Sequence, residues 1–559
     1  MSRDLARIMF DAPVKLSNLS DFTFNHDQVV IGLKKLEFNS LIRKINASEF
    51  GNSAIRELSE VTTENESASP VTTGASDSSQ ESTIPNSHNL IIDWNIKSLM
   101  HNNESVAKDI LNGKDFWDLG QAAFLLNPLA REEPQLSVPE EEYRNQIKAL
   151  EKYPKLFIIY KEFDLPLIPI LYKMEEKGML IDRGYFKDLQ SEYEKIIKNL
   201  EQQIYELAGI EFNINSPLQL SEVLFTRLQL PTKGIKKTTR GYSTGAKELD
   251  KLKDQHPIIA KITEYREAAK LLSTYITPIP ALADKNNRIH TTFTQNVTAT
   301  GRLSSKDPNL QNIPVRTSEG KRIRQGFIAS KGKVLVSADY SQFELRLAAI
   351  LSNDQALIDD FNHDVDIHTK TASEAFGVSM DKVTKEQRRA AKVINFGILY
   401  GMSVKGLSDA AKMPFYEAKQ FIDNYFELRA PIKKKLESIL KQAREEGCVE
   451  TFYGRRRPTP DVKSSNFIIR QSAERAAQNM PIQGTEADLM KRAMIKVDSK
   501  LPEGADLVMQ VHDSLIVECD ESQKTTVAKI LKTEMESVAP ELDIKLAVEV
   551  TTGQNWGEL

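Results

Sequence analysis

Two segments of this 559-residue chain show the hydrophobic pattern of buried strands. The run VLVSADY at 334–340 is apolar and rich in β-branched residues, which predicts a strand that ends at Asp339. Two apolar stretches within 507–518 flank His512 and Asp513, and they predict a hairpin with the aspartate at its turn. We therefore expect both carboxylates to lie at strand ends.

Longer segments show helical periodicity. Amphipathic patterns near 185–207 and 259–275 predict two long helices, with a basic loop rich in Thr and Gly at 233–244 between them. The chain should therefore combine a sheet with many helices.

One predicted helix, in RRAAKVINFGILYG at 388–401, carries an unusual face. Residues at intervals of four share that face: they are Arg388, Lys392, Phe396 and Tyr400. A core stripe would not carry the two cations, and a solvated face would not carry the two rings. Cations suit a triphosphate and flat apolar surface suits a base and sugar. Long cationic side chains lying over packed aromatics are the structural alternative.

Together with that helix, Asp339 and Asp513 suggest a metal-binding pair. A single aspartate at a strand end is usually a cap or a turn residue. Paired carboxylates can hold two Mg²⁺ ions and leave coordination positions for phosphates. Two such ions can activate an attacking hydroxyl and stabilise a leaving oxygen.

Composition narrows the possible partners. The net charge of −4 excludes a globally basic nucleic-acid binder, so any such contact needs local basic patches. Candidate patches lie at 233–240, 321–324 and 454–458. Two cysteines do not suggest a disulfide framework, and no signal peptide or membrane-length apolar run is evident. These features predict a soluble, intracellular protein.

The motifs DYSQFELR, RRAAKVINFGILYG and QVHDSLIVE resemble motifs A, B and C of the family A DNA polymerases, the bacterial DNA polymerase I type. The resemblance continues through segments 298–316, 474–488 and 553–559, and covers about 155–559. It implies a monomeric enzyme that adds dNTPs to the 3′-OH of primer–template DNA in replication or repair. It also implies two Mg²⁺ ions, with Mn²⁺ able to substitute, and a location in the bacterial cytosol or nucleoid or in a phage-infected cell.

The fold implied by this resemblance is an α+β multidomain protein, a right-hand polymerase with an antiparallel palm sheet and helical fingers and thumb. The polymerase domain would occupy 156–559. Its parts would be a thumb at about 183–290, a palm at about 291–352 and 486–559, and fingers at about 353–485.

The first 155 residues resemble other parts of the family. Residues 1–50 resemble the junction after the 5′-nuclease domain, which itself is absent from this sequence, as in a large fragment. Residues 51–155 resemble a shrunken RNase H-like 3′–5′ exonuclease domain. Within it, 61–87 is dominated by Ser, Thr, Asn, Glu and Gly, which predicts a disordered loop.

The exonuclease motifs are incomplete. In HNLIIDWNI, Asn89 and Asp93 match the second motif, but the Asp-x-Glu pair of the first is missing. The third motif needs Asp four residues after Tyr, and Tyr143 is followed there by Ile147. One carboxylate cannot hold two ions, so we expect a remnant without proofreading activity.

The resemblance also assigns roles around the nucleotide. Asp339, Asp513 and the backbone carbonyl of Tyr340 would bind the metals. Arg388 and Lys392 would neutralise the phosphates, and Lys392 would protonate the leaving group. Phe396 would stack on the incoming base and sugar, Tyr400 would abut the templating pair, and Gln342 would also contact the nucleotide. Glu344, packed with Tyr400, would close the space that a ribose 2′-OH needs; a solvated carboxylate is the alternative.

DNA contacts are implied in two places. Polar residues spaced by four on a second helix, together with others, would contact the minor groove. Hydrogen-bond donors there test the geometry of a base pair without reading its sequence. These residues are Arg302, Arg475, Asn479 and Gln483, with His512 and Arg316 near the primer. Lys236 and Lys237 in the thumb loop would track the backbone.

Two positions depart from the family pattern. Phe343 stands where Ile is usual, and Ser514 stands where Glu usually follows the His-Asp pair. Fidelity, metal preference and sugar discrimination are the properties most exposed to these changes.

Two other functions fit part of the pattern. Single-subunit phage-type RNA polymerases share the palm and its aspartates but lack the carboxylate at Glu344. A DNA-binding scaffold derived from a polymerase should have lost its catalytic carboxylates, and both are present. Copying of RNA templates is a compatible side activity.

Overall fold

The structure is a computed structural model that describes residues 90–130, 138–239, 241–315, 317–397 and 400–559. These residues belong to one compact unit, Ile84–Leu559. The predicted junction at 1–50, the predicted loop at 61–87, Asn89 and Arg316 lie outside the described residues.

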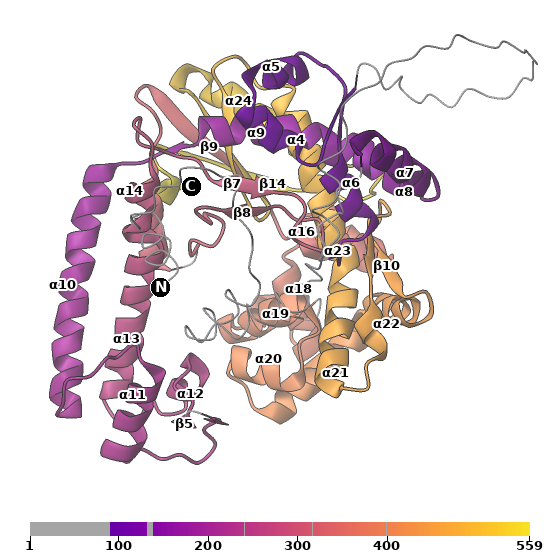
Figure 1. The fold of residues 1–559 in the computed structure, drawn as a ribbon. Helices are drawn as coiled ribbons and strands as arrows, with labels where there is room; N and C mark the ends of the chain where they lie inside the picture. The colour runs from indigo at the N-terminus through magenta and orange to yellow at the C-terminus, as the bar shows by residue number, and fades with distance from the viewer. Residues whose placement is uncertain (1–89, 131–137, 240, 316, 398–399) are drawn as a thin grey trace, which may run out of the picture. The chain divides into compact units, whose positions relative to one another are not determined.

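A four-stranded antiparallel sheet carries the predicted strand and hairpin (Figure 1). Its strands, in spatial order, are β12 (Asp506–Val511), β13 (Ser514–Asp520), β9 (Lys333–Tyr340) and β14 (Val548–Gly553). β9 ends one residue later than predicted. In the register, Asp339 lies opposite Ser514 on one side and Glu549 on the other. The predicted strand and hairpin are therefore confirmed.

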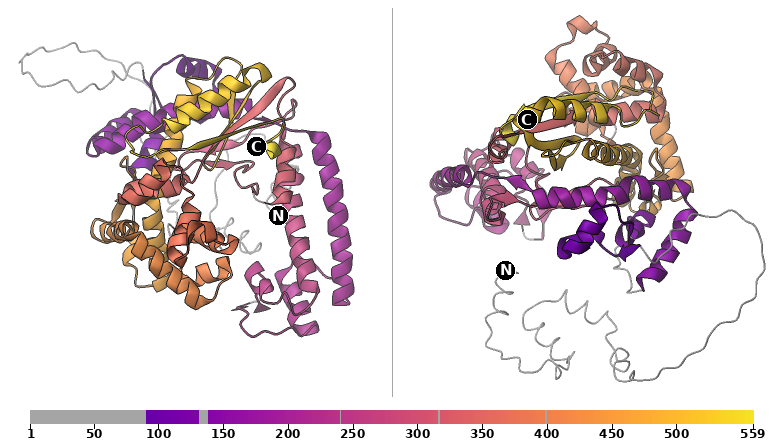
Figure 2. Two further views of the ribbon diagram at one scale, coloured as in Figure 1. Left: turned by 180° about the vertical axis from the view of Figure 1, so that it is seen from behind. Right: turned by 90° about the horizontal axis from the view of Figure 1, so that it is seen from above.

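Helix α24 (Lys524–Glu536) lies along this sheet, as the yellow helix in Figure 2 shows. The Tyr340 hydroxyl donates to the Met535 carbonyl at 2.7 Å. Phe343 stacks on the Tyr340 ring, with centroids 4.1 Å apart. The unusual Phe343 is thus a core residue that supports the end of β9.

The two predicted long helices are confirmed and pack against each other (Figure 1). They are α10 (Arg183–Ala208) and α13 (Ile258–Leu271), the latter continued by η5 (Leu272–Ile276) and α14 (Pro278–Leu282). Short elements join them: α11 (Pro217–Ser221), η4 (Glu222–Arg227), β4 (Lys237–Thr238), β5 (Gly241–Tyr242) and α12 (Ala246–Asp250). The far ends of the long helices share a separate hydrophobic cluster with these short elements.

A mostly helical insertion separates β9 from β12. Its first helices are α16 (Phe343–Ser352), α17 (Gln355–Asn362), α18 (Ile367–Phe376), η6 (Met380–Lys382) and α19 (Lys385–Gly397). There follow α20 (Val404–Ala411), α21 (Phe415–Leu428), α22 (Ala430–Glu445), β10 (Cys448–Glu450), β11 (Arg456–Pro458) and η8 (Pro460–Lys463). The last helix, α23 (Phe467–Asp498), is 32 residues long, contains Pro481 and runs through the predicted fingers–palm boundary at 485/486.

Short strands and one helix connect the long helices to the sheet. β3 (Met179–Leu180) pairs with β6 (Arg288–Ile289), and β7 (Thr292–Thr294) pairs with β8 (Ser304–Lys306). Helix α15 (Ser318–Gln325) precedes β9, and η9 (Glu521–Gln523) and η10 (Trp556–Glu558) follow the later strands.

In two of the three predicted basic patches, one arginine is buried. Arg324 is 9% exposed and lies over the Trp556 ring, 4.3 Å from its centroid. Arg455 is 2% exposed and pairs with two buried aspartates. Sequence letters alone do not show that an arginine in a basic run points inward.

The first described residues form a small parallel two-stranded sheet with helices. Its elements are β1 (Ile91–Asp93), α4 (Ile96–Asn102), α5 (Glu104–Leu111), β2 (Phe116–Asp118), α6 (Leu119–Leu126), α7 (Pro139–Glu151), α8 (Pro154–Ile159), η3 (Tyr160–Asp164) and α9 (Leu165–Lys177). Phe116 to Asp118 form β2 by pairing with β1, and α6 follows directly.

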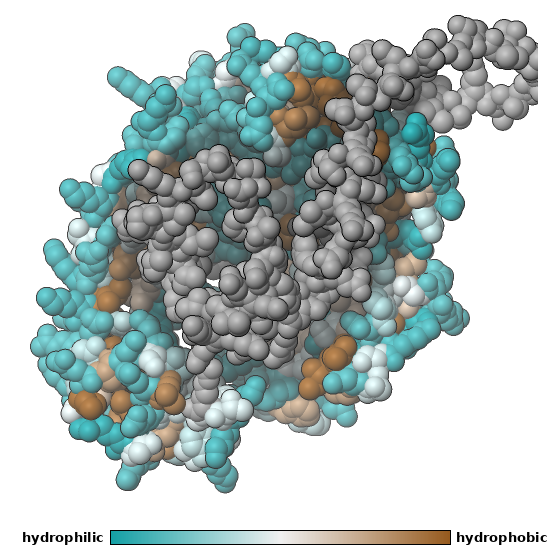
Figure 3. Space-filling model, in the orientation of Figure 1, coloured by the Kyte–Doolittle hydropathy of each residue, from teal (hydrophilic) through white to brown (hydrophobic). Residues whose placement is uncertain are grey.

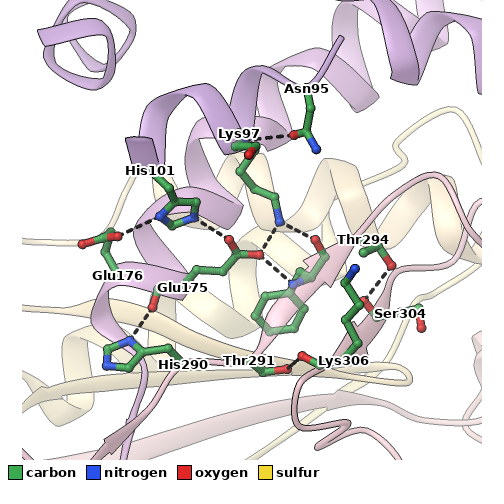
Figure 4. Close-up of polar contacts among 12 residues, drawn as sticks. Asn95, Lys97, His101, Glu175, Glu176, His290, Thr291, Thr294, Ser304 and Lys306 are labelled. Carbon is green, nitrogen blue, oxygen red and sulfur yellow. Dashed lines mark hydrogen bonds and ion pairs between the residues drawn. The ribbon is translucent and has the colours of Figure 1, made fainter. Parts of the chain in front are cut away.

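A charged cluster joins α4 to α9, and we call it the α4–α9 latch (Figure 4). Lys97 and His101 on α4 reach Glu175 and Glu176 on α9. Glu175 is 6% exposed and also accepts from the backbone N–H of Phe293 at 2.6 Å.

Much of the surface seen in Figure 3 is hydrophilic, with small hydrophobic patches. Among the described residues, every helix is too short or too polar to cross a membrane.

Candidate active site

Asp339 and Asp513 meet at one end of the central sheet. Asp339 lies near the end of β9 with its side chain exposed, and Asp513 follows β12 at the hairpin turn. The backbone N–H of Tyr340 donates to the Asp513 carbonyl at 3.2 Å. The two carboxylates predicted to act together are thus adjacent.

The electrostatics of Asp339 fit a cation site. Partial desolvation by the surrounding protein, together with the charges of Asp513 and Glu549, raises the pKa of Asp339 to about 6. Like charges held close together favour a bound proton or a metal ion. The carboxylate and backbone oxygens are hard donors of the kind that Mg²⁺ prefers. In the described part of the chain no three His, Cys, Asp or Glu side chains are grouped to hold a metal by themselves.

The hairpin turn explains how Asp513 is placed. His512 has φ 51°, a left-handed conformation uncommon for a residue with a side chain. The Ser514 hydroxyl donates to the Val511 carbonyl at 3.0 Å across the turn. Ser514 therefore closes the turn, and its hydroxyl is not directed to a ligand.

A buried ionic group lies behind Asp513. Arg302 Nη2 donates to Glu344 Oε1 at 2.8 Å and to the two carboxylate oxygens of Glu486 at 2.7 and 2.6 Å. Glu486 also hydrogen-bonds Asp513, and burial and this contact raise the pKa of Glu486 well above its usual range. Glu486 was not predicted from the sequence, because nothing in its helical context distinguishes it.

Tyr400 and Glu344 are in direct contact, as predicted. The Tyr400 hydroxyl donates to the Glu344 carboxylate and also hydrogen-bonds Gln483. Burial and the Glu344 charge raise the pKa of the Tyr400 phenol. However, the backbone at Tyr400 is not α-helical, whereas the other three residues of the predicted stripe lie on α19.

The remaining stripe residues lie together on α19. Arg388 is exposed and pairs with Asp366, with Nε 2.9 Å from Oδ2. Burial opposes the Asp366 charge, but hydrogen bonds from Arg388 and Thr369 outweigh it and lower its pKa to about 2. Lys392 is exposed and makes no hydrogen bond or ion pair with the described residues, so its ammonium group is available to a ligand.

His368 on α18 faces the same stripe. Its ring lies 5.8 Å from the Phe396 ring, centroid to centroid. Burial, followed by the charges of Arg388 and Lys392, lowers the pKa of His368 to about 4. Neither His368 nor Asp366 was predicted, since neither belongs to a spaced pattern in the sequence.

Two predicted ligand-binding residues have buried polar atoms without a partner among the described residues. They are Gln342, through Oε1, and Asn479, through Oδ1. Gln342 also has φ 52° and precedes α16 without capping it. A buried unpaired oxygen is costly unless a ligand or water satisfies it.

Three of the predicted DNA-reading residues, Arg475, Asn479 and Gln483, lie on α23. Arg475 packs against Gly401, whose φ is 64°, and a Cβ there would lie 2.9 Å from Arg475 Cγ. Lys236 and Lys237 lie at and beside the exposed β4–β5 hairpin. Arg316 is outside the described residues.

The pattern that defines DNA polymerase family A matches residues 183–558. The DNA polymerase I of Caldicellulosiruptor bescii is 39% identical, over 100% of this chain and 72% of that protein. The thermostable DNA polymerase I of Thermus aquaticus is 47% identical, over 75% of this chain and 51% of that protein, so the match spans about half the Thermus protein. A solved structure of the polymerase domain of Pol1 from M. smegmatis, in complex with DNA primer-template and dNTP, matches with a TM-score of 0.74 and 36% identity, covering 79% of this chain and 82% of that one.

The mixed helix-and-sheet fold and these matches define a DNA-directed DNA polymerase, a nucleotidyltransferase. The chain belongs to DNA polymerase family A, of the bacterial DNA polymerase I type.

Proposed function

We propose that this polymerase extends a primer 3′-OH with dNTPs by two-metal phosphoryl transfer. The observation that supports this most directly is the adjacency of Asp339 and Asp513 at one end of the sheet. Asp339, Asp513 and the Tyr340 carbonyl would hold Mg²⁺, with Mn²⁺ as a substitute. When bound, such ions lower the pKa of the attacking hydroxyl and stabilise the leaving pyrophosphate.

The chain's own residues supply the remaining chemistry. Lys392, free of protein partners among the described residues, neutralises phosphate charge and donates a proton to the leaving group. Arg388 joins it after leaving Asp366. Phe396 offers its half-buried ring to the base and sugar, and Gln342 offers its unpaired oxygen.

Sugar selection rests on the contact between Glu344 and Tyr400. The hydrogen bond between them fixes the Glu344 carboxylate, which is 7% exposed. A ribose 2′-OH arriving there would need to displace a buried, hydrogen-bonded group. Deoxynucleotides are therefore preferred.

Primer–template DNA is the proposed partner of a monomeric enzyme in the bacterial cytosol. Arg475, Asn479 and Gln483 would contact the minor groove, and His512 would support the primer end. Arg302 and Arg316 would join them, and Lys236 and Lys237 would track the backbone. Assays on RNA templates test reverse transcription as a side activity.

Primer extension with Mg²⁺ tests the metal assignment. Asp339→Ala and Asp513→Ala should each lower extension by about 10³-fold or more, because a lost ligand removes metal-based stabilisation of the transition state. Primer–template binding should persist, since it rests on phosphate contacts elsewhere. Glu549→Ala is the matched control: it removes the charge opposite Asp339 but no proposed ligand. An aspartate variant no worse than this control contradicts the assignment.

We also propose that the segment before the polymerase domain is an exonuclease remnant without proofreading activity. Asp93 Oδ1 accepts from the Asn95 N–H at 2.8 Å. Asp118 lies opposite Asp93 in the register but is 6% exposed, and its oxygens accept from the N–H groups of Ile96 and Gln121. Local structure thus uses both oxygens of Asp118 and one oxygen of Asp93.

A labelled primer with a 3′ mismatch tests this second proposal. Incubated with enzyme and Mg²⁺ but without dNTPs, the primer should keep its full length, because two-metal hydrolysis needs carboxylates free to bind ions. Shortening that disappears in Asp93→Ala would show an active exonuclease. Asp109→Ala, which changes an aspartate on α5, controls for loss by mutation of the segment in general.

A further inference from the structure

Glu486 is a buried acid in contact with the candidate site that the proposed mechanism does not use. It lies on α23 and is 1% exposed. Its carboxylate touches Arg302 on one side and Asp513 on the other. Glu486 therefore connects a predicted DNA-reading residue with a predicted metal ligand.

Arg302 is held at one corner of its guanidinium group. Every hydrogen bond that its side chain makes to the described residues uses Nη2, which contacts Glu344 and Glu486. Its Nε is buried and has no partner among them. A planar guanidinium has five N–H donors, so this hold fixes the position of the group and leaves donors for another ligand.

Glu486 and Arg302 depend on each other. In the described part of the chain, Arg302 is the one cation within ion-pair distance of Glu486. A buried carboxylate needs a paired cation, and loss of either partner leaves the other uncompensated. Burial opposes the Arg302 charge, but Glu486 and Glu344 outweigh it and raise the Arg302 pKa further above its usual range.

The placement also bears on the departure at Ser514. That position carries no carboxylate, whereas α23 brings one against Asp513 from a different part of the chain. Glu486 contacts Asp513, and both of its carboxylate oxygens accept hydrogen bonds from Arg302. Its role is thus to hold neighbours in place, with Arg302 as the group that reaches outward.

We propose that Glu486 is a positioning residue that orients Arg302 for contact with the primer-terminal base pair, so that the rate of incorporation depends on the geometry of that pair. This inference rests on the proposed minor-groove role of Arg302. Because the phosphate-binding residues lie on α19, Glu486 should affect the incorporation rate and mismatch sensitivity without changing dNTP affinity.

Single-turnover incorporation on matched and 3′-mismatched primers tests the proposal as a double-mutant cycle. Arg302→Ala and Glu486→Ala should each slow matched incorporation by about 10- to 100-fold, the scale for a misplaced group in an active site. Both should reduce the matched-to-mismatched rate ratio and leave the apparent dNTP Kd unchanged. The double variant should be no slower than Arg302→Ala, because one residue acts through the other.

Two further variants separate positioning from folding. Glu486→Gln keeps an oxygen that can accept from Nη2 and should recover part of the rate. Asp498→Asn changes another acid of α23, one that pairs with the half-exposed Lys173, and its effect should multiply with that of Arg302→Ala. Thermal unfolding of each variant shows that the protein is folded, and Glu486→Gln carries the cycle if Glu486→Ala is not.

The outcomes distinguish the positioning role of Glu486 from the minor-groove role of Arg302. Multiplicative effects of Glu486 and Arg302, or a changed dNTP Kd, overturn the positioning role alone. An Arg302→Ala enzyme with the parental mismatch ratio overturns the minor-groove role and, with it, this inference. Masking of the Glu486 effect by Arg302→Ala supports both.

Discussion

Phe396 illustrates what one side chain can decide at the residue scale. It lies on α19 one turn after the exposed Lys392, with its ring near His368. The proposed nucleotide would therefore place its triphosphate on the cation and its sugar against the ring. The edge of that ring should face the sugar 3′ position.

Phe396→Tyr should increase acceptance of dideoxynucleotides. The added hydroxyl could stand in for the missing 3′-OH, which is worth about tenfold if one hydrogen bond of about 1.4 kcal/mol is gained. The ratio of dideoxynucleotide to dNTP incorporation measures this. Phe426→Tyr, on α21, adds the same hydroxyl away from the site and should leave the ratio unchanged. Unaltered discrimination in the Phe396 variant would place the ring away from the sugar.

Individual residues differ in how far the sequence could reveal them. Asp339 and Asp513 could be predicted because each interrupts or ends an apolar run at a strand boundary. Glu486 could not, because its partner Arg302 is 184 positions away and an ordinary helical acid gives no sign of it. His368 and Asp366 were missed for the same reason. Contacts between distant segments depend on packing, which a local pattern does not contain.

Helices and strands were easier to predict than the points where they end. The long helices and the hairpin follow from periodicity, which persists over many residues. The backbone at Tyr400 does not, since the four-residue spacing continues to Tyr400 although that residue is not α-helical. Met402 packs where a Cβ on Gly397 would lie, and Gly401 adopts φ 64°. Tyr400, which is not in α-helical conformation, contacts Glu344 on α16.

The α4–α9 latch depends on pH through His101. Its hydrogen bond with Glu175 is the main cause that raises the His101 pKa above 6.5; burial opposes this and Glu176 adds to it. Lys97, Tyr172 and the carbonyl contact of His290 complete the surroundings. A histidine with a raised folded-state pKa stabilises the fold fully below its unfolded pKa, and the gain is lost as pH rises through the folded value.

His101→Gln should therefore destabilise the protein most at low pH. The difference in unfolding midpoint from the parent should be largest near about pH 5.5 and shrink toward about pH 8. Its size should be on the order of 1 kcal/mol, as for partly exposed pairs. Differential scanning fluorimetry at several pH values measures it, with exposed His363→Gln as the control. A difference that grows with pH would contradict this account.

At the scale of the whole molecule, a buried four-charge cluster joins distant parts of the chain. Asp164 at the end of η3 accepts from Arg455 Nη2 at 2.8 Å and Lys491 Nζ at 2.6 Å. Arg455 Nε donates in turn to Asp488 at 2.7 Å. All four side chains are at most 3% exposed. The two positive and two negative charges balance. Removal of any one of them would leave a buried charge without its partner.

Asp164→Ala should lower the free energy of unfolding by about 3–5 kcal/mol, because two buried cations would lose their shared acceptor. Asp498→Ala, which removes the partner of the half-exposed Lys173, should cost about 1 kcal/mol or less. Urea unfolding followed by tryptophan fluorescence compares the two variants. Equal losses would mean that burial does not govern the strength of these pairs.

The overall architecture could be predicted from the sequence, whereas the burial of individual charged residues could not. Motif order implied a polymerase fold, and the family match confirms that recognition. Basic runs, however, predicted surface patches at Arg324 and Arg455, both of which are buried. Whether an arginine faces solvent or a buried acid is settled only when several segments assemble.

The proline within α23 has a mechanical consequence. Pro481 has no N–H, so the Ala477 carbonyl lacks its helical donor, while the Thr485 hydroxyl donates to the Pro481 carbonyl at 2.6 Å. A helix bends most cheaply where a rung is already missing. Arg475 and Asn479 lie on one side of that point and Glu486 on the other. Any bending of α23 should therefore occur at Pro481, between the predicted DNA-reading residues Arg475 and Asn479 and the buried Glu486.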